Sequence, residues 1–241
     1  MIDLHCHILP GLDDGSDSLD TSCRMAALAA DCGVRYIVAT PHCNTRSDPK
    51  NYRSAALRDA LTALQRELDR WQIPVRLLPG AEVLVRGDFE DLLARDMLPT
   101  LNGSRYLLVE FYFDESASFM ERALRAVRQA GLVPVLAHPE RYAAIQARPH
   151  LAELLRDAGC LLQLNKDSIL GRLGEDCFDT ASLLLHRDLA FALASDAHHY
   201  RRRSTDLTLL LEALDRRFPE ADPEKLLRTN PLLIVNDRPA E

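Results

Sequence analysis

The chain has 241 residues, of which 47% are hydrophobic and 27% charged, and its formal net charge is −7. The composition is ordinary for a globular protein, and the negative charge argues against a nucleic-acid surface built on bulk electrostatics. No run of about 18 apolar residues predicts a membrane span. The first residues read as a strand rather than as a basic segment followed by an apolar one, so we expect no signal peptide and a cytoplasmic location.

The six cysteines include no CxxC pair, which indicates reduced thiols in a protein without a secretion signal. Cysteine-dependent tyrosine phosphatases resemble one another in a C-x5-R loop. The residues six positions after the cysteines of this chain are Leu12, Ala29, Val38, Pro49, Lys166 and Leu183. None is arginine, so the sequence argues against that class of enzyme.

Short β-type runs alternate with longer amphipathic segments along the chain. We expect strands at Ile2–Leu4, Tyr36–Ala39, Val75–Leu78, Tyr106–Glu110, Pro134–Ala137, Leu161–Leu164 and Ala190–Ala194. We expect helices at Ser18–Asp31, Arg53–Trp71, Asp88–Ala94, Phe119–Ala130, His150–Asp157, Cys177–His186 and Ser204–Arg217. Ser18 and Ser118 fit helix N-caps, and Gly33, Gly131 and Gly159 fit helix ends.

Repeated strand–helix units favour a parallel sheet, and about seven units in this length favour a closed α/β barrel. An open doubly wound sheet is the alternative, which the absence of a Gly-rich dinucleotide or P-loop motif weakens. No linker or internal repeat is visible, so residues 1–241 read as one domain. Two polar segments, Cys43–Tyr52 and His199–Arg203, are expected to form loops over the active-site end.

Candidate metal ligands lie at the ends of the expected strands. Side chains alternate along a strand, so DLHCH places His5 and His7 on one face and Leu4 and Cys6 on the other. An isolated HxH is more often inert than a metal site. Six of about seven strands end in a candidate ligand, however, the later ones being His42, Glu82, Glu110, His138, Asp196 and His198. In a parallel barrel these ends converge on one face, which predicts a common site.

Imidazole and carboxylate ligands without thiolates suit Zn, Mn or Fe ions in a catalytic cluster. Carboxylates can bridge ions about 3.5–4 Å apart, the usual apparatus for displacing a phosphate ester. Arg201, Arg202 and Arg203 follow SDAHHY at the same face. Because guanidinium pairs bidentately with phosphate, capture of an anion is favoured over a solvated charge run.

The motifs DLHCHILPGLDDG, ATPH, GAE, LVEF, AHPERY and SDAH, in this order, resemble the PHP (polymerase and histidinol phosphatase) superfamily. They are most similar to its bacterial manganese-dependent protein-tyrosine phosphatases of capsular and exopolysaccharide biosynthesis, over Met1 to about Asn236. The resemblance implies a distorted, TIM-barrel-like (β/α)7 barrel with its active site at the C-terminal ends of the strands. It also implies up to three ions, with Mn²⁺ first and Zn²⁺, Fe, Co²⁺ or Mg²⁺ as alternatives.

Carried over by position, the resemblance implies three sets of metal ligands: His5, His7, Glu82 and Asp196; Glu82, Glu110 and His138; and Asp14, His42 and His198. Asp13 fits a turn with Gly15, and the assignment of Asp14 as a ligand comes mainly from the resemblance. Arg141 of HPER and a second arginine, Arg203, would contact the phosphate. The RRR run leaves the register of that second arginine open.

The implied reaction is hydrolysis of phosphotyrosine by a metal-bound hydroxide, on the tail of a polysaccharide co-polymerase tyrosine kinase. Phenolate is a fair leaving group because the pKa of tyrosine is about 10. One alternative is a phosphoesterase for a small phosphate, such as histidinol phosphate or a nucleotide phosphodiester. A second is an amidohydrolase, in which Lys166 would bridge the ions as a carbamate, although Lys166 reads as a rim lysine. A third is a non-catalytic regulator that binds a kinase tail.

Overall fold

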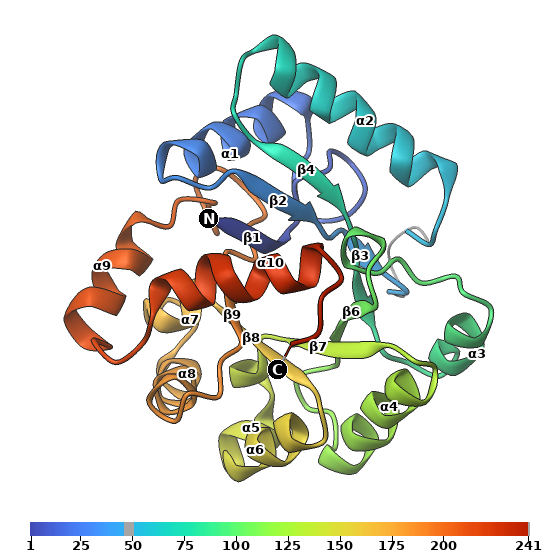
Figure 1. The fold of residues 1–241 in the computed structure, drawn as a ribbon, viewed down its shortest axis with the longest axis vertical. Helices are drawn as coiled ribbons and strands as arrows, with labels where there is room; N and C mark the ends of the chain where they lie inside the picture. Colours follow the sequence, from blue (N-terminus) through green and yellow to red (C-terminus); the bar gives the residue numbers. More distant parts are fainter. Residues whose placement is uncertain (46–50, 241) are drawn as a thin grey trace.

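The computed structural model describes residues 1–45 and 51–240, so part of the expected loop Cys43–Tyr52, residues 46–50, lies outside the described residues. Strands and helices alternate along the chain, with the helices arranged around the strands (Figure 1). The described strands are β1 (Ile2–Cys6), β2 (Tyr36–Ala39), β3 (His42–Cys43), β4 (Arg76–Pro79), β5 (Glu82–Leu84), β6 (Tyr106–Glu110), β7 (Val133–Ala137), β8 (Leu161–Asn165) and β9 (Ala192–Ala194).

The helices are α1 (Leu19–Asp31), α2 (Ala55–Arg70), α3 (Phe89–Ala94), α4 (Ala117–Gln129), α5 (Ala143–Ala147), α6 (His150–Asp157), α7 (Lys166–Ile169), α8 (Glu175–His186), α9 (Thr208–Arg217) and α10 (Asn230–Val235). A π-helical segment, Lys225–Thr229, leads into α10. None of the helices in the described ranges is long and apolar enough to cross a membrane.

The nine described strands occupy seven positions because the chain continues beyond two of the expected strands, Tyr36–Ala39 and Val75–Leu78, into the short strands β3 and β5. Pro41 separates β2 from β3, and it has no N–H to donate to a neighbouring strand. Gly80 lies between β4 and β5, where an added Cβ would come within 2.8 Å of the Val38 side chain. All pairings are parallel, in the orders β1-β2-β4 and β3-β5-β6-β7-β8-β9.

The two sheets meet where β1 lies beside the end of β9. The amide of Asp196 donates to the carbonyl of His5 at 2.9 Å, and that of His7 donates to the carbonyl of Ala197 at 2.9 Å. The buried carboxylate of Asp3 accepts from both the amide (3.0 Å) and the hydroxyl (2.5 Å) of Ser195. The α/β barrel expected from the sequence is therefore present, but continuous strand pairing does not close it.

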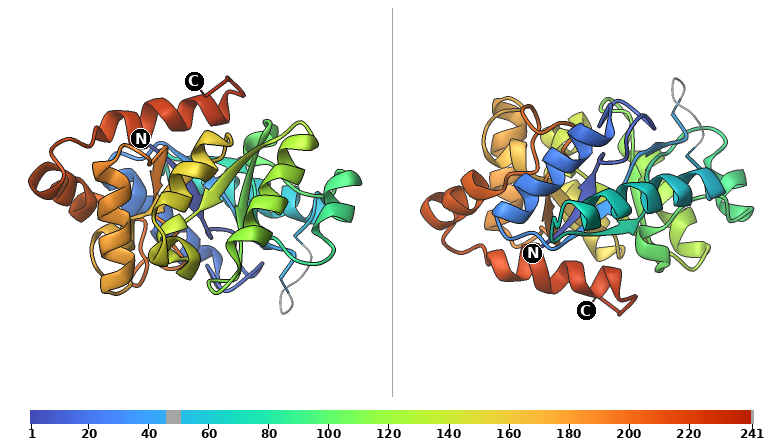
Figure 2. Two further views of the ribbon diagram at one scale, coloured as in Figure 1. Left: turned by 90° about the horizontal axis from the view of Figure 1, so that it is seen from below. Right: turned by 90° about the horizontal axis from the view of Figure 1, so that it is seen from above.

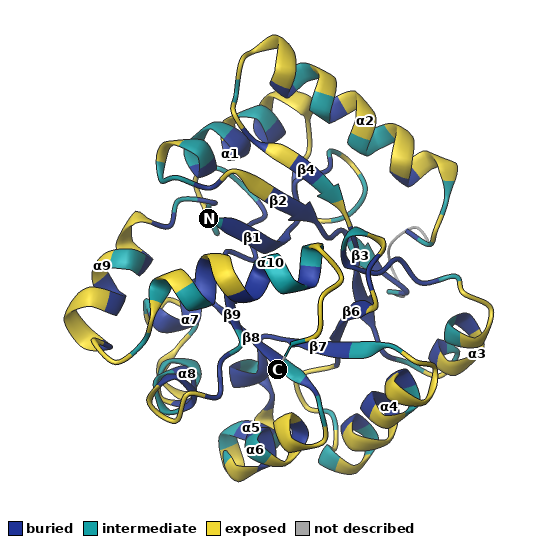
Figure 3. Ribbon diagram, in the orientation of Figure 1, coloured by how far each residue is buried: buried dark blue, intermediate teal, exposed yellow. Residues whose placement is uncertain are grey.

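Two apolar clusters stabilise the barrel. The smaller joins residues of β1, β2, β6, β7 and β9 to Ile234 of α10. In both views of Figure 2, α10 lies across the end at which β1 begins, so this cluster fills the interior at that end. The larger cluster packs the strands against the surrounding helices. The strands are accordingly buried throughout most of their length, whereas the outer surfaces of the helices are exposed (Figure 3).

The strand β1 departs from simple alternation. Its register against β2 shifts between Asp3 and Cys6. Leu4 consequently belongs to the smaller apolar cluster and Cys6 to the larger one, so the prediction that these two side chains share a face is wrong. His5 and His7 do converge, with 3.2 Å between their Nε2 atoms.

The helix ends only partly follow the sequence-based prediction. Ser18 caps α1, where its hydroxyl accepts a hydrogen bond from the amide of Thr21. The helix α4 begins at Ala117, two residues before its predicted start, so the prediction that Ser118 is its N-cap is wrong. The segment from Lys225 to Val235 was not expected to be helical, and it forms the π-helical turn and α10.

Candidate metal centre

The first two predicted ligands face two carboxylates at the end of the barrel opposite α10. The Nε2 atoms of His5 and His7 each lie 3.3 Å from Oε2 of Glu82. Each also lies 3.5 Å from Oδ1 of Asp196, which follows β9. Two imidazole nitrogens and two carboxylate oxygens thus converge on one buried point, as the ligands of a cation would.

Glu82 extends this group to two further strands. Its Oε1 atom accepts a hydrogen bond from Nε2 of His138 at 2.8 Å, while Oε2 lies 3.1 Å from Nδ1 of His42. The same nitrogen of His42 lies 3.1 Å from Oε1 of Glu110. The carboxylate of Glu82 therefore stands between four imidazoles, in the position that a bridging ligand requires.

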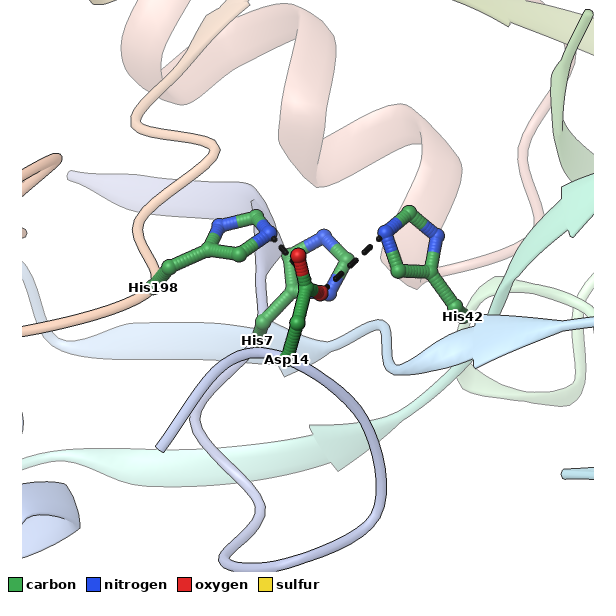
Figure 4. Close-up of side chains that lie close together, drawn as sticks. All are labelled: His7, Asp14, His42 and His198. Atoms are coloured by element: carbon green, nitrogen blue, oxygen red, sulfur yellow. Dashed lines mark ion pairs between the residues drawn. The ribbon is translucent and has the colours of Figure 1, made fainter. Parts of the chain in front are cut away.

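A third group forms around Asp14, whose carboxylate lies between the rings of His42 and His198 (Figure 4). Its Oδ1 atom is 3.4 Å from Nε2 of His42 and 3.5 Å from Nε2 of His198. The ring of His7 stacks near that of His198, with 3.9 Å between their centroids. The loop after β1 thus brings Asp14 over His7 of the same loop and over the histidines of two other segments.

These residues fit metal ions. Ligand atoms within 4.8 Å of one another occur in three sets: His7, Asp14, His42 and His198; His5, His7 and Asp196; and His42, Glu82 and Glu110. Buried ring nitrogens of His42 (Nδ1) and His198 (Nε2) have no hydrogen-bond partner in the described residues. Such orphaned nitrogens are costly unless something binds them, and a cation would do so. The division of ligands among individual ions stays a prediction, because the sets share His7 and His42.

Two polar residues outside the predicted set orient the first histidines. The side-chain oxygen of Gln163 accepts a hydrogen bond from Nδ1 of His5 at 2.8 Å. The carboxylate of Asp13 accepts from Nδ1 of His7 at 2.7 Å. Both bonds hold the proton on Nδ1 and leave the Nε2 lone pair facing the centre.

Asp13 also completes the turn that the sequence predicted. Its Oδ1 atom accepts from the amide of Gly15 at 2.9 Å, and its Oδ2 atom accepts from the amide of His42 at 2.8 Å. An added Cβ at Gly15 would lie 2.4 Å from His7, so only glycine fits there. The sequence offered one signal that Asp13 also orients His7, namely its position next to the predicted ligand Asp14. For Gln163 the signal was a polar side chain inside the apolar strand β8.

The backbone turns sharply at three residues of the centre. His138, Asp196 and Arg203 adopt left-handed conformations, with φ of 40°, 48° and 48°. Non-glycine residues rarely adopt this conformation, and it persists only where the surroundings hold it. Here the amide of His138 donates to Gln163 and that of His198 to Arg203. Two of these turns come just after strands β7 and β9, and the third lies in the loop after β9.

Two arginines lie beside the carboxylate of Asp196. The guanidinium of Arg203 is 2.5 Å from Oδ2 of Asp196, and that of Arg141 is 3.6 Å from the same atom. Arg201 and Arg202 are exposed, and Arg201 lies over the ring of Tyr200 instead. Among the three successive arginines, Arg203 is therefore the one that faces the centre.

Lys166 is not at the rim of the barrel, so that prediction is wrong. Its side chain is fully buried, and its ammonium donates to the backbone carbonyls of Ser204 and Asp206. It thereby anchors the segment that follows Arg203. Because its ammonium binds these carbonyls and not the histidine cluster, the structure does not support a carbamate on Lys166 that bridges two ions.

Attraction between opposite charges dominates the centre. Burial disfavours the charged imidazole of His42, but the nearby carboxylates of Glu110 and Glu82 outweigh it and raise its pKa to about 11. Burial likewise opposes ionisation of Glu82 and Asp196, but the positive histidines, His5 first, hold the pKa of both well below the usual range. Without a metal, protons on imidazoles balance the ionised carboxylates. A bound cation would replace those protons.

A cavity of about 880 Å³ opens over the centre. Its polar lining consists of Asp14, His42, Thr45, Glu82, Glu110, Asp114, His138, Arg141, Asp196 and Arg203. Its apolar lining consists of Leu84, Phe111, Tyr112 and Phe113. The cavity can therefore hold an anion beside the arginines together with a sizeable apolar group.

The sequence matches the protein family described as "Capsular polysaccharide synthesis, CpsB/CapC" over residues 1–236. The chain belongs to this family. It is 35% identical over 239 residues to the tyrosine-protein phosphatase YwqE of Bacillus subtilis, covering 98% of this chain and 92% of the relative. It is 28% identical over 243 residues to the tyrosine-protein phosphatase CpsB of Streptococcus pneumoniae, covering 99% of each chain. The resemblance recognised in the sequence is thus confirmed.

Solved structures agree with this membership. A structure from a study of B. subtilis YwqE and S. pneumoniae CpsB, described as unique metal-dependent tyrosine phosphatases, matches with a TM-score of 0.91 and 34% identity. The match covers 100% of this chain and 96% of the other. The lactonase Lmo2620 of Listeria monocytogenes matches with a TM-score of 0.60 and 12% identity, covering 99% and 95% of the two chains, so it shares only the fold.

Proposed function

We propose that this protein is a metal-dependent protein-tyrosine phosphatase that hydrolyses phosphotyrosine. The observation that carries the proposal is the carboxylate of Glu82, which lies within 3.3 Å of ring nitrogens of His5, His7, His42 and His138. Such a carboxylate suits a bridge between ions of a hydrolytic cluster. The named activities of the two relatives and the metal dependence of the solved structure support the same function.

The predicted ligands are His5, His7, Asp14, His42, Glu82, Glu110, His138, Asp196 and His198, and we propose that they hold up to three ions. Mn²⁺ is the proposed ion, since this donor set without thiolates accepts it and other divalent ions. Bound ions would provide hydroxide near neutral pH and would neutralise charge on the phosphoryl oxygens.

The chain's own residues bind and orient the substrate. Arg141 and Arg203 approach Asp196 from the cavity side. There each guanidinium group can donate two hydrogen bonds to the oxygens of a phosphate. They would stabilise the equatorial oxygens as the bond to the leaving group breaks. Gln163 and Asp13 keep His5 and His7 in the tautomer that exposes Nε2. The phenolate leaving group departs toward the open side of the cavity.

We propose a phosphorylated protein tail, such as that of a bacterial polysaccharide co-polymerase tyrosine kinase, as the natural substrate. The cavity is open to solvent beside Tyr112 and Phe113, which are both exposed, so a peptide chain can reach it. The family's description supports a role in capsular polysaccharide synthesis.

The test is release of phosphate from a phosphotyrosine peptide by metal-stripped protein, before and after addition of Mn²⁺, Zn²⁺, Mg²⁺ or Co²⁺. We expect chelation to abolish release and Mn²⁺ to restore it, with Asp196→Asn inactive under all conditions. A phosphoserine peptide of the same sequence and histidinol phosphate serve as comparisons. Preferred turnover of histidinol phosphate would overturn the substrate assignment. No turnover with any ion, in protein that binds metal, would favour a tail-binding regulator instead.

A further inference from the structure

The cavity over the metal centre has one apolar side. Tyr112 and Phe113, directly after β6, line it with 38% and 44% of their surface exposed. The other apolar lining residues, Leu84 and Phe111, are buried. Exposed apolar surface in this lining therefore comes, within the described residues, from Tyr112 and Phe113, and the position of the bound phosphate decides which of the two an apolar substituent meets.

Phe113 is held in place although its ring is exposed. Its carbonyl accepts a hydrogen bond from the amide of Ala143 at 2.8 Å. Its ring centroid lies 6.1 Å from that of Tyr142 and 5.9 Å from that of His138. Tyr142 is itself fully buried, and its hydroxyl accepts from the amide of Phe111 at 3.1 Å. An exposed aromatic ring with such support can bind a partner without first becoming ordered.

The same ring lies next to the proposed phosphate ligand. The guanidinium carbon of Arg141 is 4.1 Å from the centroid of the Phe113 ring. A phosphate bound by Arg141 is therefore adjacent to Phe113, and in phosphotyrosine the aromatic ring begins one ester oxygen away from phosphorus. Aromatic rings attract one another at centroid separations of about 4.5–7 Å, in offset or edge-to-face arrangements. The ring of a phosphotyrosine held by Arg141 can therefore come within this range of Phe113.

We propose that Phe113 determines the specificity of this site by contacting the phenyl ring of phosphotyrosine while Arg141 binds the phosphate. This inference rests on the proposed phosphatase function and adds the element that selects aryl over alkyl phosphate esters. Phosphoserine and other alkyl phosphates carry no ring, so they gain nothing from Phe113. Tyr112 lines the same cavity, but in the described part of the chain the cation–π contact of Arg141 is with Phe113, so Tyr112 is the matched control.

The experiment compares kcat/KM of the wild-type protein, Phe113→Leu, Phe113→Trp and Tyr112→Leu, all with the same added metal. The substrates are a phosphotyrosine peptide and an alkyl phosphate monoester, and each variant is compared with wild type on the same substrate. This comparison cancels the intrinsic difference between the leaving groups. The inhibition constant of inorganic phosphate and the melting temperature report separately on Arg141 and on folding.

We expect Phe113→Leu to lower kcat/KM for the phosphotyrosine peptide about tenfold and that for the alkyl phosphate less than about twofold. Phe113→Trp retains activity on the peptide, Tyr112→Leu leaves the ratio of the two substrates unchanged, and inhibition by phosphate is the same in all variants. Equal losses on both substrates, or no loss on either, would overturn the role of Phe113 while leaving the phosphatase function intact. Absence of phosphotyrosine turnover by the wild-type protein would overturn the proposed function itself.

Discussion

Replacing Asp13 by asparagine tests how the histidines of the centre are oriented. The buried carboxylate of Asp13 accepts three hydrogen bonds, from Nδ1 of His7 (2.7 Å) and the amides of His42 (2.8 Å) and Gly15 (2.9 Å). Asparagine has nearly the same shape but only one accepting atom. Its amide nitrogen must therefore face at least one of these donors, and the bond to His7 loses its charge.

The expected magnitude follows from these bonds. Loss of a partner that orients a ligating histidine typically costs 10–100-fold in metal affinity or activity. We expect Asp13→Asn to weaken Mn²⁺ binding within that range, which corresponds to about 1.4–2.7 kcal/mol. At saturating Mn²⁺ much of the activity should return, because Asp13 acts through His7 and His42 rather than on the substrate.

The assay is calorimetric titration of metal-stripped protein with Mn²⁺, together with the rate of phosphate release as a function of free Mn²⁺. Asp17→Asn is the matched control, since Asp17 is exposed and its carboxylate accepts from the hydroxyl of Thr21, outside the predicted ligand set. An unchanged affinity in Asp13→Asn, with the fold intact by melting temperature, would refute the orienting role of this carboxylate.

Three further predictions concern other residues. Cys43→Ser should keep activity within about twofold, because burial raises the thiol pKa to about 12 and leaves no thiolate to react; lost activity with normal folding and metal content would argue for a cysteine nucleophile. Lys166→Met should lower the free energy of unfolding by about 1–3 kcal/mol, since it leaves the carbonyl of Ser204 without its donor; an unchanged unfolding midpoint in urea would contradict this anchoring role. Metal binding should release protons and strengthen between about pH 6 and pH 8, because His42, with a pKa near 11, carries at pH 7 a proton that a metal ion must displace. Calorimetry in buffers of different ionisation enthalpy measures that release, and heats independent of the buffer would count against it.

The sequence predicts the seven strand positions because apolar runs and turn residues are local signals. It does not predict the breaks at Pro41 and Gly80. These depend on whether a neighbouring strand needs a backbone N–H donor at that position, or on how closely a neighbouring side chain approaches the backbone there. Nor does it predict the helical segment Lys225–Val235. The apolar face of this segment is buried only because Ile234 packs against the strands inside the barrel.

The candidate ligands could be found because the ends of parallel strands meet at one face, whatever the details of packing. The pairing of each histidine with the residue that orients it could not, since the bond between His5 and Gln163 joins positions 158 residues apart and depends on the register of β8. The resemblance pointed to Arg203, but the sequence left the choice among the three arginines open. That choice follows from a left-handed turn at Arg203 and from the anchoring of Ser204 by Lys166.

The pairing of Asp3 with Ser195 joins two positions separated by 192 residues. During synthesis β1 emerges well before Ser195, the residue that its Asp3 pairs with. His5 and His7 are likewise synthesised long before Asp196, the carboxylate that both of them face. No N-terminal fragment that stops short of Ser195 contains Asp196 or His198, so the full set of predicted ligands comes together only after about four fifths of the chain has been synthesised. Until then His5 and His7 lack the carboxylate that the structure places beside them.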